Sequence, residues 1–451
     1  DHRLAGLVTS NGNLLLSRRK SNHQIMRPLP QIPEWVRLEH EVAQLLTEQE
    51  LHGWYFDQHA AWKLASTLRK ELEETCQLLR DRHPFVAGSI FTPKRNNRTQ
   101  GYVAGAESTR LKETNPTSRD HISWILQTFH GWKPTQLTAT GKPIIDEIVL
   151  KEIVASGGPP IALDFLKCLD ITKSLGMISE GTNAWLKLCT TASRIHHHCS
   201  VATNTHRCAH RKPNLGQTKS DPEFRKLFQA SPGQIMVGAD LSGIELRMLA
   251  HYLGRWSSEF GDTLLTGDIH QVNADRVGVS RRQIKTISYA FIYGAGNEKI
   301  GYSYDPLLSS ANAKKKGKEI REAFVSAIDG LAELLEAIKE KSKEGYIRSI
   351  DGRHIKVDSP HKALNYLLQS GAGVIAKRWL TINHTHIQEL GLCASQLAFI
   401  HDELQFECHP DHAQDLSASL VLSSAEAGEY YKLRVPITAE AKIGANWAEV
   451  H

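Results

Sequence analysis

The sequence predicts an α+β protein whose small sheet is assembled from segments that long helical stretches separate. Apolar runs at residues 235–237 and 397–400 each lead into an aspartate, Asp240 and Asp402, as expected for two buried strands with acidic side chains at their ends. The second strand would turn back as a hairpin with Asp402 at its tip. Helical periodicity covers residues 39–79 and most of 248–346. We therefore expect the two strands to be adjacent and the aspartates to face each other.

The two aspartates suggest a site for divalent cations. Hard oxygen ligands suit magnesium, and two ions about 3.5–4 Å apart can activate a hydroxyl group and stabilise the charge of a phosphoryl transfer. The alternative for each aspartate alone is that it starts a turn or caps a helix, which is common at such boundaries. A third segment helps to choose between these interpretations.

That segment, residues 281–295, reads RRQIKTISYAFIYGA. Arg281, Lys285, Tyr289 and Tyr293 recur every fourth residue, which places them along one helix face that is cationic at one end and aromatic at the other. Cations would hold a triphosphate, an aromatic ring can stack on a base or sugar, and Gly294 permits close approach. Taken alone, the helix is better explained as amphipathic, with basic residues in solvent and tyrosines in the core.

In this order the three segments resemble motifs A, B and C of family A DNA polymerases, the DNA polymerase I superfamily. Motif A, an aspartate followed by SxxELR, is matched by Asp240, Ser242, Glu245, Leu246 and Arg247. Motif B, RxxxKxxxF/YxxxYG, is matched by Arg281, Lys285, Tyr289, Tyr293 and Gly294. Motif C, HDE, is matched by His401, Asp402 and Glu403.

Further stretches at 267–274, 359–373 and 442–451 resemble the replicative branch of short-tailed phages, and the resemblance covers the chain from about residue 34 to its end. It implies a right-hand polymerase fold with an antiparallel-sheet palm, helical fingers and a helical thumb. The implied boundaries are the thumb and its connection to the palm at 34–180, a first palm segment at 181–247, fingers at 248–345 and a second palm segment at 346–451. Residues 1–33 remain an unassigned N-terminal extension.

The resemblance implies a catalytic centre for two Mg²⁺ ions, with Mn²⁺ as a substitute. Asp240 and Asp402 would bind the metals together with the carbonyl oxygen of Leu241. Glu403 would support the two aspartates. Lys285 would act as a catalytic cation that also gives a proton to the leaving pyrophosphate.

The same resemblance implies a nucleotide site. Arg281, Lys285 and His270 would grip the phosphates. Glu245 would leave no room for a ribose 2′-hydroxyl and would reject ribonucleotides; as an alternative, it is only an acid favoured at a helix start. Tyr289 carries a hydroxyl thought to replace the missing 3′-hydroxyl of a dideoxynucleotide, which predicts poor discrimination against chain terminators.

Contacts with the primer-template duplex are implied as well. Tyr293 would stack at the templating position. Four further residues match positions that read minor-groove acceptors near the primer terminus, and those acceptors are shared by all correct base pairs: Arg207, Asn365, Gln369 and His401. Such contacts would sense the geometry of a pair without reading its sequence.

Three features depart from the family pattern. The stretch THRCAH at 205–210 replaces the usual TGR, so that His206 stands where glycine precedes the arginine. Residues 286–288 read TIS where phage relatives carry bulkier side chains, and Gly243 stands where bacterial members have glutamine. These differences bear on rate and fidelity more than on the class of reaction.

Composition agrees with a nucleic-acid partner without demanding one. Lys and Arg number 54 against 49 Asp and Glu, a formal net charge of +5. The seven cysteines are scattered and show no paired CxxC spacing, which indicates a reduced, intracellular protein. Histidine and cysteine residues crowd positions 196–210, but their spacing matches no common zinc module, so we do not expect structural zinc there.

The periodic stretch 39–79 suits paired thumb helices, and the polar stretch 83–117 reads as a loop. In some phage relatives a thumb insertion binds a host thioredoxin, and the loop here is much shorter, which argues against thioredoxin dependence. Only about 33 residues precede the expected thumb, too few for a proofreading exonuclease, so we expect no proofreading in this chain. No run approaches the ~20 apolar residues of a membrane span.

We therefore expect a template-directed DNA polymerase that adds dNTPs to a primer 3′-hydroxyl, acting in phage DNA replication in the bacterial host cytoplasm. Primer-template DNA and dNTPs are the expected partners, and a phage helicase or primase is a candidate. Two alternatives remain: a single-subunit RNA polymerase, which would lack the Glu245 gate and would use rNTPs, and a catalytically silent primer-template binding module, which would bind without extension.

Overall fold

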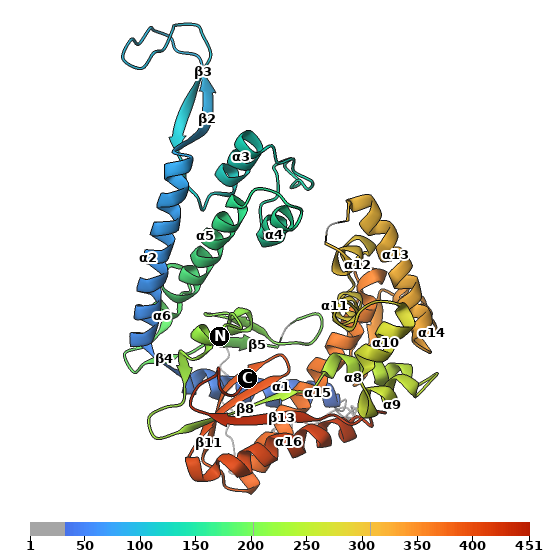
Figure 1. The fold of residues 1–451 in the computed structure, drawn as a ribbon. Helices are drawn as coiled ribbons and strands as arrows, with labels where there is room; N and C mark the ends of the chain where they lie inside the picture. Colours follow the sequence, from blue (N-terminus) through green and yellow to red (C-terminus); the bar gives the residue numbers. More distant parts are fainter. Residues whose placement is uncertain (1–31, 202, 307) are drawn as a thin grey trace, which may run out of the picture.

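The structure is a computed structural model that describes residues 32–201, 203–306 and 308–451 (Figure 1). Its centre is a four-stranded antiparallel sheet in the order β11-β12-β8-β13, formed by β8 (Ile235–Leu241), β11 (Ala394–Ile400), β12 (Glu403–Cys408) and β13 (Ala439–Gly444). The expected α+β class and the expected hairpin are confirmed. The expected adjacency is wrong in detail, because β8 pairs with β12, the second arm of the hairpin, and not with β11.

Close packing of the sheet explains its sequence. All six residues of β12 are buried, including the polar side chains of Glu403, Gln405 and Glu407. Gly238 in β8 faces this strand, and a Cβ atom there would lie 2.5 Å from the side-chain amide of Gln405 and 2.7 Å from the carbonyl oxygen of Val450. A glycine is therefore required in β8 for the C-terminal segment to pack over the sheet.

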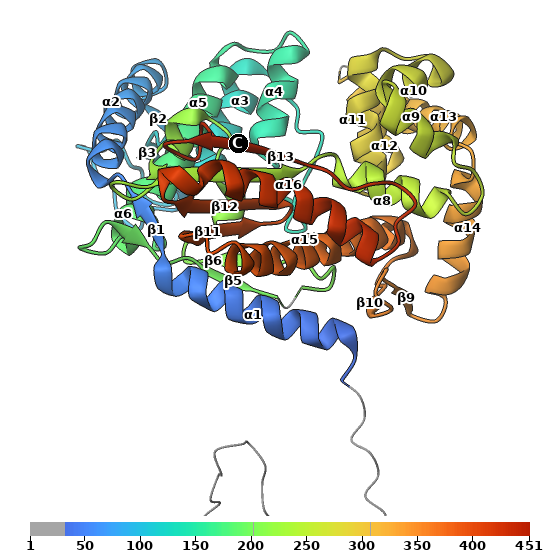
Figure 2. The ribbon, with the colours of Figure 1, turned by 90° about the horizontal axis from the view of Figure 1, so that it is seen from below.

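Helices cover the lower face of the sheet (Figure 2). The 27-residue α15 (Ala363–Glu389) packs against α16 (Ala413–Tyr430), and α16 contacts β8 and β13. The indole N–H of Trp379 donates to the carbonyl of Leu420 at 2.8 Å and joins the two helices. The main hydrophobic core lies between these helices, the sheet and the helices that follow β8.

The stretch 39–79 does not form one helix pair. Its first half belongs to α1 (Glu34–His52), which lies along the β11 edge of the sheet and contacts β11, α15 and β5 (His198–Ser200) (Figure 2). Burial of an apolar stripe on α1 explains this position, because the stripe joins the main core: Leu38, Val42, Leu45 and Leu46. The second half, in α2 (Gln58–Arg82), packs against a different long helix, α5 (Ile161–Leu175).

α2 and α5 rise from one side of the sheet and carry α3 (Arg119–His130) and α4 (Glu147–Ala155) at their far end (Figure 1). This body has a hydrophobic core of its own, which includes Ile122, Leu126 and Phe165. The expected loop at 83–117 is wrong in part, because β2 (Phe85–Phe91) and β3 (Ser108–Glu113) form an antiparallel hairpin at the tip of α2. The sequence shows little sign of these strands, because most of their side chains are exposed and apolar and polar residues therefore do not alternate clearly.

A second helical body follows β8 and stands on the opposite side of the sheet (Figure 1). It contains α8 (Ile244–Leu253), α9 (Glu259–Thr266), α10 (Ile269–Val277), α11 (Arg281–Ile292), α12 (Asn297–Tyr304), α13 (Ser310–Ala327) and α14 (Leu331–Ser342). Two glycines let α12 and α13 touch through their backbones: a Cβ atom at Gly301 would lie 2.0 Å from the carbonyl of Ala313, and one at Gly317 would lie 1.7 Å from that of Asn297. The hairpin of β9 (Tyr346–Arg348) and β10 (His354–Lys356) leads into α15.

Small elements complete the base. β1 (Trp54–Phe56), β4 (Arg194–Ile195) and β7 (Phe228–Gln229) form a three-stranded sheet in the order β4-β1-β7, and β5 pairs with β6 (Ala209–Arg211). Short helices are α6 (Trp185–Leu188) and α7 (Pro222–Arg225), with a π-helical turn at Gly176–Glu180 and 3₁₀ turns at Leu215–Gln217, Pro360–Lys362 and Pro410–His412. The rings of Trp54 and Trp447 pack with centroids 5.0 Å apart, which fastens the C-terminal segment to β1.

Within the described residues, none of the helices is both long enough and apolar enough to cross a membrane. Of the unassigned extension at 1–33, residues 1–31 lie outside the part of the chain that the structure describes.

Candidate active site

Asp240 and Asp402 meet at one end of the central sheet. Asp240 is the next-to-last residue of β8, and Asp402 lies in the two-residue turn between β11 and β12. The turn is tight because His401 adopts a left-handed backbone with φ of 59°. Glu403 is the register partner of Asp240 on one side, and Glu440 of β13 is its partner on the other.

Burial and mutual repulsion shape the electrostatics of the two aspartates. Burial and, after it, the charge of the neighbouring Asp240 raise the pKa of Asp402 to about 7. Burial likewise raises the pKa of Asp240 to about 6, with Glu403 as the next cause. Among the described residues, no lysine, arginine or histidine side chain forms an ion pair with either carboxylate. The charges of Arg207 and His451 offset this repulsion only in part. Two crowded carboxylates are hard oxygen donors of the kind that a divalent cation prefers, so the residues fit the expected magnesium ions.

Glu403 points into the protein and is held by the C-terminal segment. Its Oε1 accepts hydrogen bonds from the indole N–H of Trp447 at 2.5 Å and from Gln405 Nε2 at 2.7 Å. Its Oε2 lies 3.3 Å from Nδ1 of His451. No sequence pattern indicates these partners, because they depend on how the chain end folds back over β12.

Two other candidate residues form hydrogen bonds with Glu245, which lies in the first turn of α8. Arg207 Nη2 donates to Glu245 Oε1 at 2.8 Å, and the hydroxyl of Tyr293 donates to the same oxygen at 3.0 Å. Glu245 as a residue is 8% exposed, and burial together with the charge of Glu245 raises the pKa of Tyr293 to about 12. Residues assigned separately to the duplex, the sugar and the templating position therefore form one hydrogen-bonded cluster.

The cationic and aromatic face of α11 is present. A capping box of Ser280 and Gln283 starts the helix. Arg281 Nε donates to Asp268 at 2.6 Å, whereas Lys285 is exposed and has no hydrogen-bond or ion-pair partner among the described residues.

Aromatic rings continue this face. The rings of Tyr289 and Tyr293 stack with centroids 6.5 Å apart, and His270 of α10 lies 6.3 Å from the Tyr289 ring. The expected phosphate-binding and base-stacking side chains thus share one surface of the second helical body.

Several candidate residues carry buried polar atoms that have no partner within the described residues. They are Nδ2 of Asn365 in α15, Nδ1 of His401 and Nδ1 of His270. Gln369 lies one helical turn after Asn365 and is partly buried. Buried polar groups in folded proteins are nearly always hydrogen-bonded. Within the described residues, partners are also missing for buried polar atoms far along the chain from these positions, such as Nε1 of Trp54 and Oγ1 of Thr114, so the missing partners do not by themselves identify a ligand.

The three histidines at the start of the 196–210 segment form hydrogen bonds with α1. His197 bonds to Gln49 at 3.0 Å, His198 bonds to the Glu50 carboxylate at 2.8 Å, and His196 bonds to the Glu50 carbonyl at 2.7 Å. Burial lowers the pKa of His197 to about 3. In the part of the chain that the structure describes, no group of three or more His, Cys, Asp or Glu side chains is arranged to hold a metal ion. The histidines fasten α1 to β5.

Comparisons with known proteins agree with one another. Residues 94–449 match the family described as DNA polymerase family A. The chain is 32% identical to the DNA-directed DNA polymerases of Enterobacteria phage T3 and Escherichia phage T7, in each case over 93% of this chain and 70% of the relative. The fold is similar to the POL domain of Pol1 from M. smegmatis, solved with DNA primer-template and dNTP, with a TM-score of 0.74 and 21% identity over 92% of this chain and 70% of that one. The right-hand fold of palm, fingers and thumb is thereby confirmed.

Proposed function

Because this chain belongs to DNA polymerase family A and is a DNA-directed DNA polymerase, we propose that it extends a primer 3′-hydroxyl by the two-metal mechanism, in phage DNA replication in a bacterial cytoplasm. The observation that carries the mechanism is the pair of crowded carboxylates, Asp240 and Asp402, at one end of the sheet. A phage setting is supported by the similarity to the T3 and T7 enzymes.

Asp240, Asp402 and the carbonyl of Leu241 would hold two Mg²⁺ ions, or Mn²⁺ in their place. When bound, such ions lower the pKa of a hydroxyl nucleophile and stabilise negative charge on the phosphoryl group. Glu403 positions β12 beside Asp240 through its bonds to Trp447 and Gln405. Its bonds within the protein favour a supporting role over direct metal binding.

Lys285 is the residue best placed to bind the triphosphate, because it has no carboxylate partner among the described residues. Its ammonium group would hold negative charge on the leaving pyrophosphate and give it a proton. Arg281 would exchange its bond to Asp268 for a phosphate oxygen. The unpartnered Nδ1 of His270 would supply a further contact with phosphate.

Sugar and base would be recognised by the Glu245 cluster. The buried carboxylate beneath the sugar would exclude a 2′-hydroxyl, both by occupying its space and by leaving it without a partner. Tyr289 would hydrogen-bond near the sugar 3′ position, and Tyr293 would stack on the templating base. Arg207 and Tyr293 keep Glu245 in place until the nucleotide arrives.

The primer-template duplex would run over α15 and the turn before β12. The free polar atoms of Asn365 and His401 support minor-groove contacts there, with Gln369 and Arg207 as the other two contact residues. We propose fingers at 248–345 and palm segments at 181–247 and 346–451, as expected from the sequence, whereas α1 is placed in the palm because it packs against β11 and α15. The thumb then begins after α1. A helicase or primase remains a candidate partner.

The test is primer extension on a hairpin template with Mg²⁺, comparing dNTPs with rNTPs. Asp402→Ala should abolish extension, whereas Asp411→Ala, which removes an exposed carboxylate nine residues away, should leave it unchanged. Extension with dNTPs alone is the expected result. Efficient extension with rNTPs, or extension by the Asp402→Ala variant, would contradict the proposal.

A further inference from the structure

Residue 206 adopts a backbone that few side chains tolerate. His206 has φ of 59°, in the left-handed region that favours glycine. A non-glycine residue keeps this conformation only when surrounding contacts hold it there. The backbone around it is tightly enclosed, because a Cβ atom at Gly373 of α15 would lie 3.2 Å from the His206 carbonyl oxygen and 3.4 Å from the Arg207 nitrogen.

The contact that distinguishes His206 is made by its ring. Nδ1 of His206 lies 2.6 Å from the hydroxyl of Ser370 in α15, and that hydroxyl donates to Ser349 at 2.7 Å. Because the Ser370 hydroxyl gives its proton to Ser349, its oxygen accepts from the N–H of His206. Burial lowers the pKa of His206 to about 4, so that the ring is neutral at pH 7.

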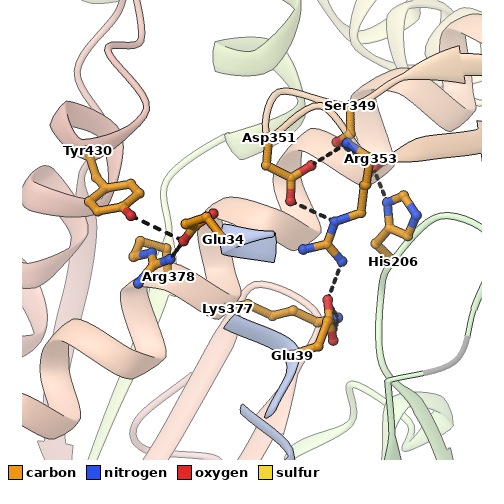
Figure 3. Close-up of polar contacts among 10 residues, drawn as sticks. Glu34, Glu39, His206, Ser349, Asp351, Arg353, Lys377, Arg378 and Tyr430 are labelled. Atoms are coloured by element: carbon orange, nitrogen blue, oxygen red, sulfur yellow. Dashed lines mark hydrogen bonds and ion pairs between the residues drawn. The ribbon is translucent and has the colours of Figure 1, made fainter. Parts of the chain in front are cut away.

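Ser349 and Ser370 lie beside a buried network of hydrogen bonds and ion pairs. Ser370 is fully buried, and the backbone N–H of Ser349 donates to the carbonyl of Arg353 at 2.9 Å. Figure 3 shows Arg353 between Asp351 and Glu39 of α1, with Lys377 of α15 on the other side of Glu39. This buried ion network fixes the hairpin and the helix from which the two serines come.

The residue after His206 is Arg207, which donates to Glu245. The carbonyl of Arg207 accepts from the hydroxyl of Thr203 at 2.5 Å, so the turn is closed on that side too. The direction in which Arg207 leaves the turn therefore depends on the conformation of His206. A change of that conformation would move the guanidinium away from the carboxylate oxygen that it shares with Tyr293.

We propose that His206 is a positioning residue: its ring, bonded to Ser370, holds the left-handed turn that delivers Arg207 to Glu245 and so aligns the site for the incoming nucleotide. The inference rests on the proposed role of Glu245 in that site. His206 also borders a surface cavity of about 520 Å³ with Trp35 and Glu39, so truncating its ring leaves no sealed void in the core.

The test compares His206→Ala, Ser370→Ala and the double variant by steady-state kinetics. Each single variant should raise KM for dNTPs about 3–10-fold with kcat changed less than twofold, and the double variant should be no worse than either single one, since both break the same bond. His206→Asn, which tolerates the left-handed backbone and keeps a side-chain N–H, should recover some of the loss.

Two further variants separate the contribution of the His206 ring from that of the left-handed backbone. His206→Gly relieves the backbone but removes the ring, so we expect it to resemble His206→Ala in KM. Lys432→Gly is the matched control, because Lys432 is an exposed residue with φ of 51° in the turn after α16, and the KM of this variant should equal that of the wild type. Equal melting temperatures across the set would exclude a global loss of structure.

Wild-type KM in both His206→Gly and His206→Ala, or additive effects in the double variant, would overturn the role of His206. Glu245→Ala tests the underlying proposal separately through the ratio of rNTP to dNTP use. If that ratio is unchanged, the assigned sugar role of Glu245 fails, whereas a non-additive rise in KM at positions 206 and 370 would still support the positioning of Arg207.

Discussion

The backbone N–H of Leu241 donates to the backbone carbonyl of Asp402 at 3.0 Å. This bond closes the ladder between β8 and the turn of the hairpin at the point where both acidic side chains leave the sheet. It holds the two aspartates at a fixed separation before any cation binds. The repulsion between them is therefore built into the fold and is open to measurement.

Asp402→Asn should remove activity and add stability. Loss of one carboxylate should reduce extension by about 10²–10³-fold or more. The same change removes a charge that is costly to bury and that repels Asp240. In metal-free buffer at pH 8, the free energy of unfolding should therefore rise by on the order of 1 kcal/mol, given about 1.4 kcal/mol per pKa unit. The gain should vanish below about pH 4, where both folded and unfolded wild-type carboxyl groups are protonated. Thermal unfolding of the wild type and the Asp402→Asn variant at pH 8 and below about pH 4 measures this gain. Equal stability of the two proteins at pH 8 would contradict the prediction.

Cation binding should depend on pH through the raised pKa values of Asp240 and Asp402, about 6 and about 7. A proton on either carboxylate competes with the metal. The apparent affinity for Mn²⁺, followed by electron paramagnetic resonance, should hold steady above about pH 8 and weaken about tenfold or more per unit below about pH 6. A pH-independent affinity between about pH 5 and pH 8 would rule out binding at these two side chains.

Glu407 should show the opposite stability profile. Burial alone would raise its pKa, but hydrogen bonds from His52 and Ser231 and the charge of Arg194 lower it to about 2. A depressed carboxyl pKa stabilises the fold above the unfolded value near 4.5, and that stability is lost as pH falls toward 2. Glu407→Gln should therefore destabilise at pH 7 by about 1–3 kcal/mol, and the difference from wild type should shrink steadily in denaturation curves below pH 4.

The buried pair of Lys377 and Glu39 predicts a compensating double variant. Lys377 is fully buried, and its ammonium group lies 2.7 Å from both carboxylate oxygens of Glu39. Glu39→Gln leaves an uncompensated buried cation and should cost about 3–5 kcal/mol. Removing both charges, in Glu39→Gln with Lys377→Met, should restore most of that stability because Arg353 keeps Asp351 as its partner. Additive losses in urea unfolding would argue against direct coupling.

Tyr289 predicts how the enzyme treats chain terminators. Its ring is half-buried between His270 and Tyr293. Tyr289→Phe removes only the hydroxyl, which should leave dNTP incorporation near the wild-type rate while lowering ddNTP incorporation about tenfold or more, equivalent to about 1–3 kcal/mol for a lost hydrogen bond. The measurement is the ratio of the two efficiencies in single-nucleotide extension. An unchanged ratio would remove the hydroxyl from terminator selection.

The sequence predicted local features better than the partners of individual side chains. The hairpin around Asp402 and the helix at 281–292 follow from apolar periodicity and capping, which act over a few residues. Arg207 and Tyr293 both donate to one oxygen of Glu245, although they lie 38 and 48 positions from it in the sequence. No local sequence pattern carries that information. The position of α1 was missed for the same reason, since an amphipathic helix shows that it is buried but not against what.

The C-terminal segment has a practical consequence for handling the protein. Trp447 and His451 both contact Glu403, the neighbour of Asp402, and Lys442 Nζ donates to the His451 carbonyl at 3.0 Å. A bulky label attached at His451 would therefore displace a side chain that lies 3.3 Å from Glu403 and whose charge acts on Asp240.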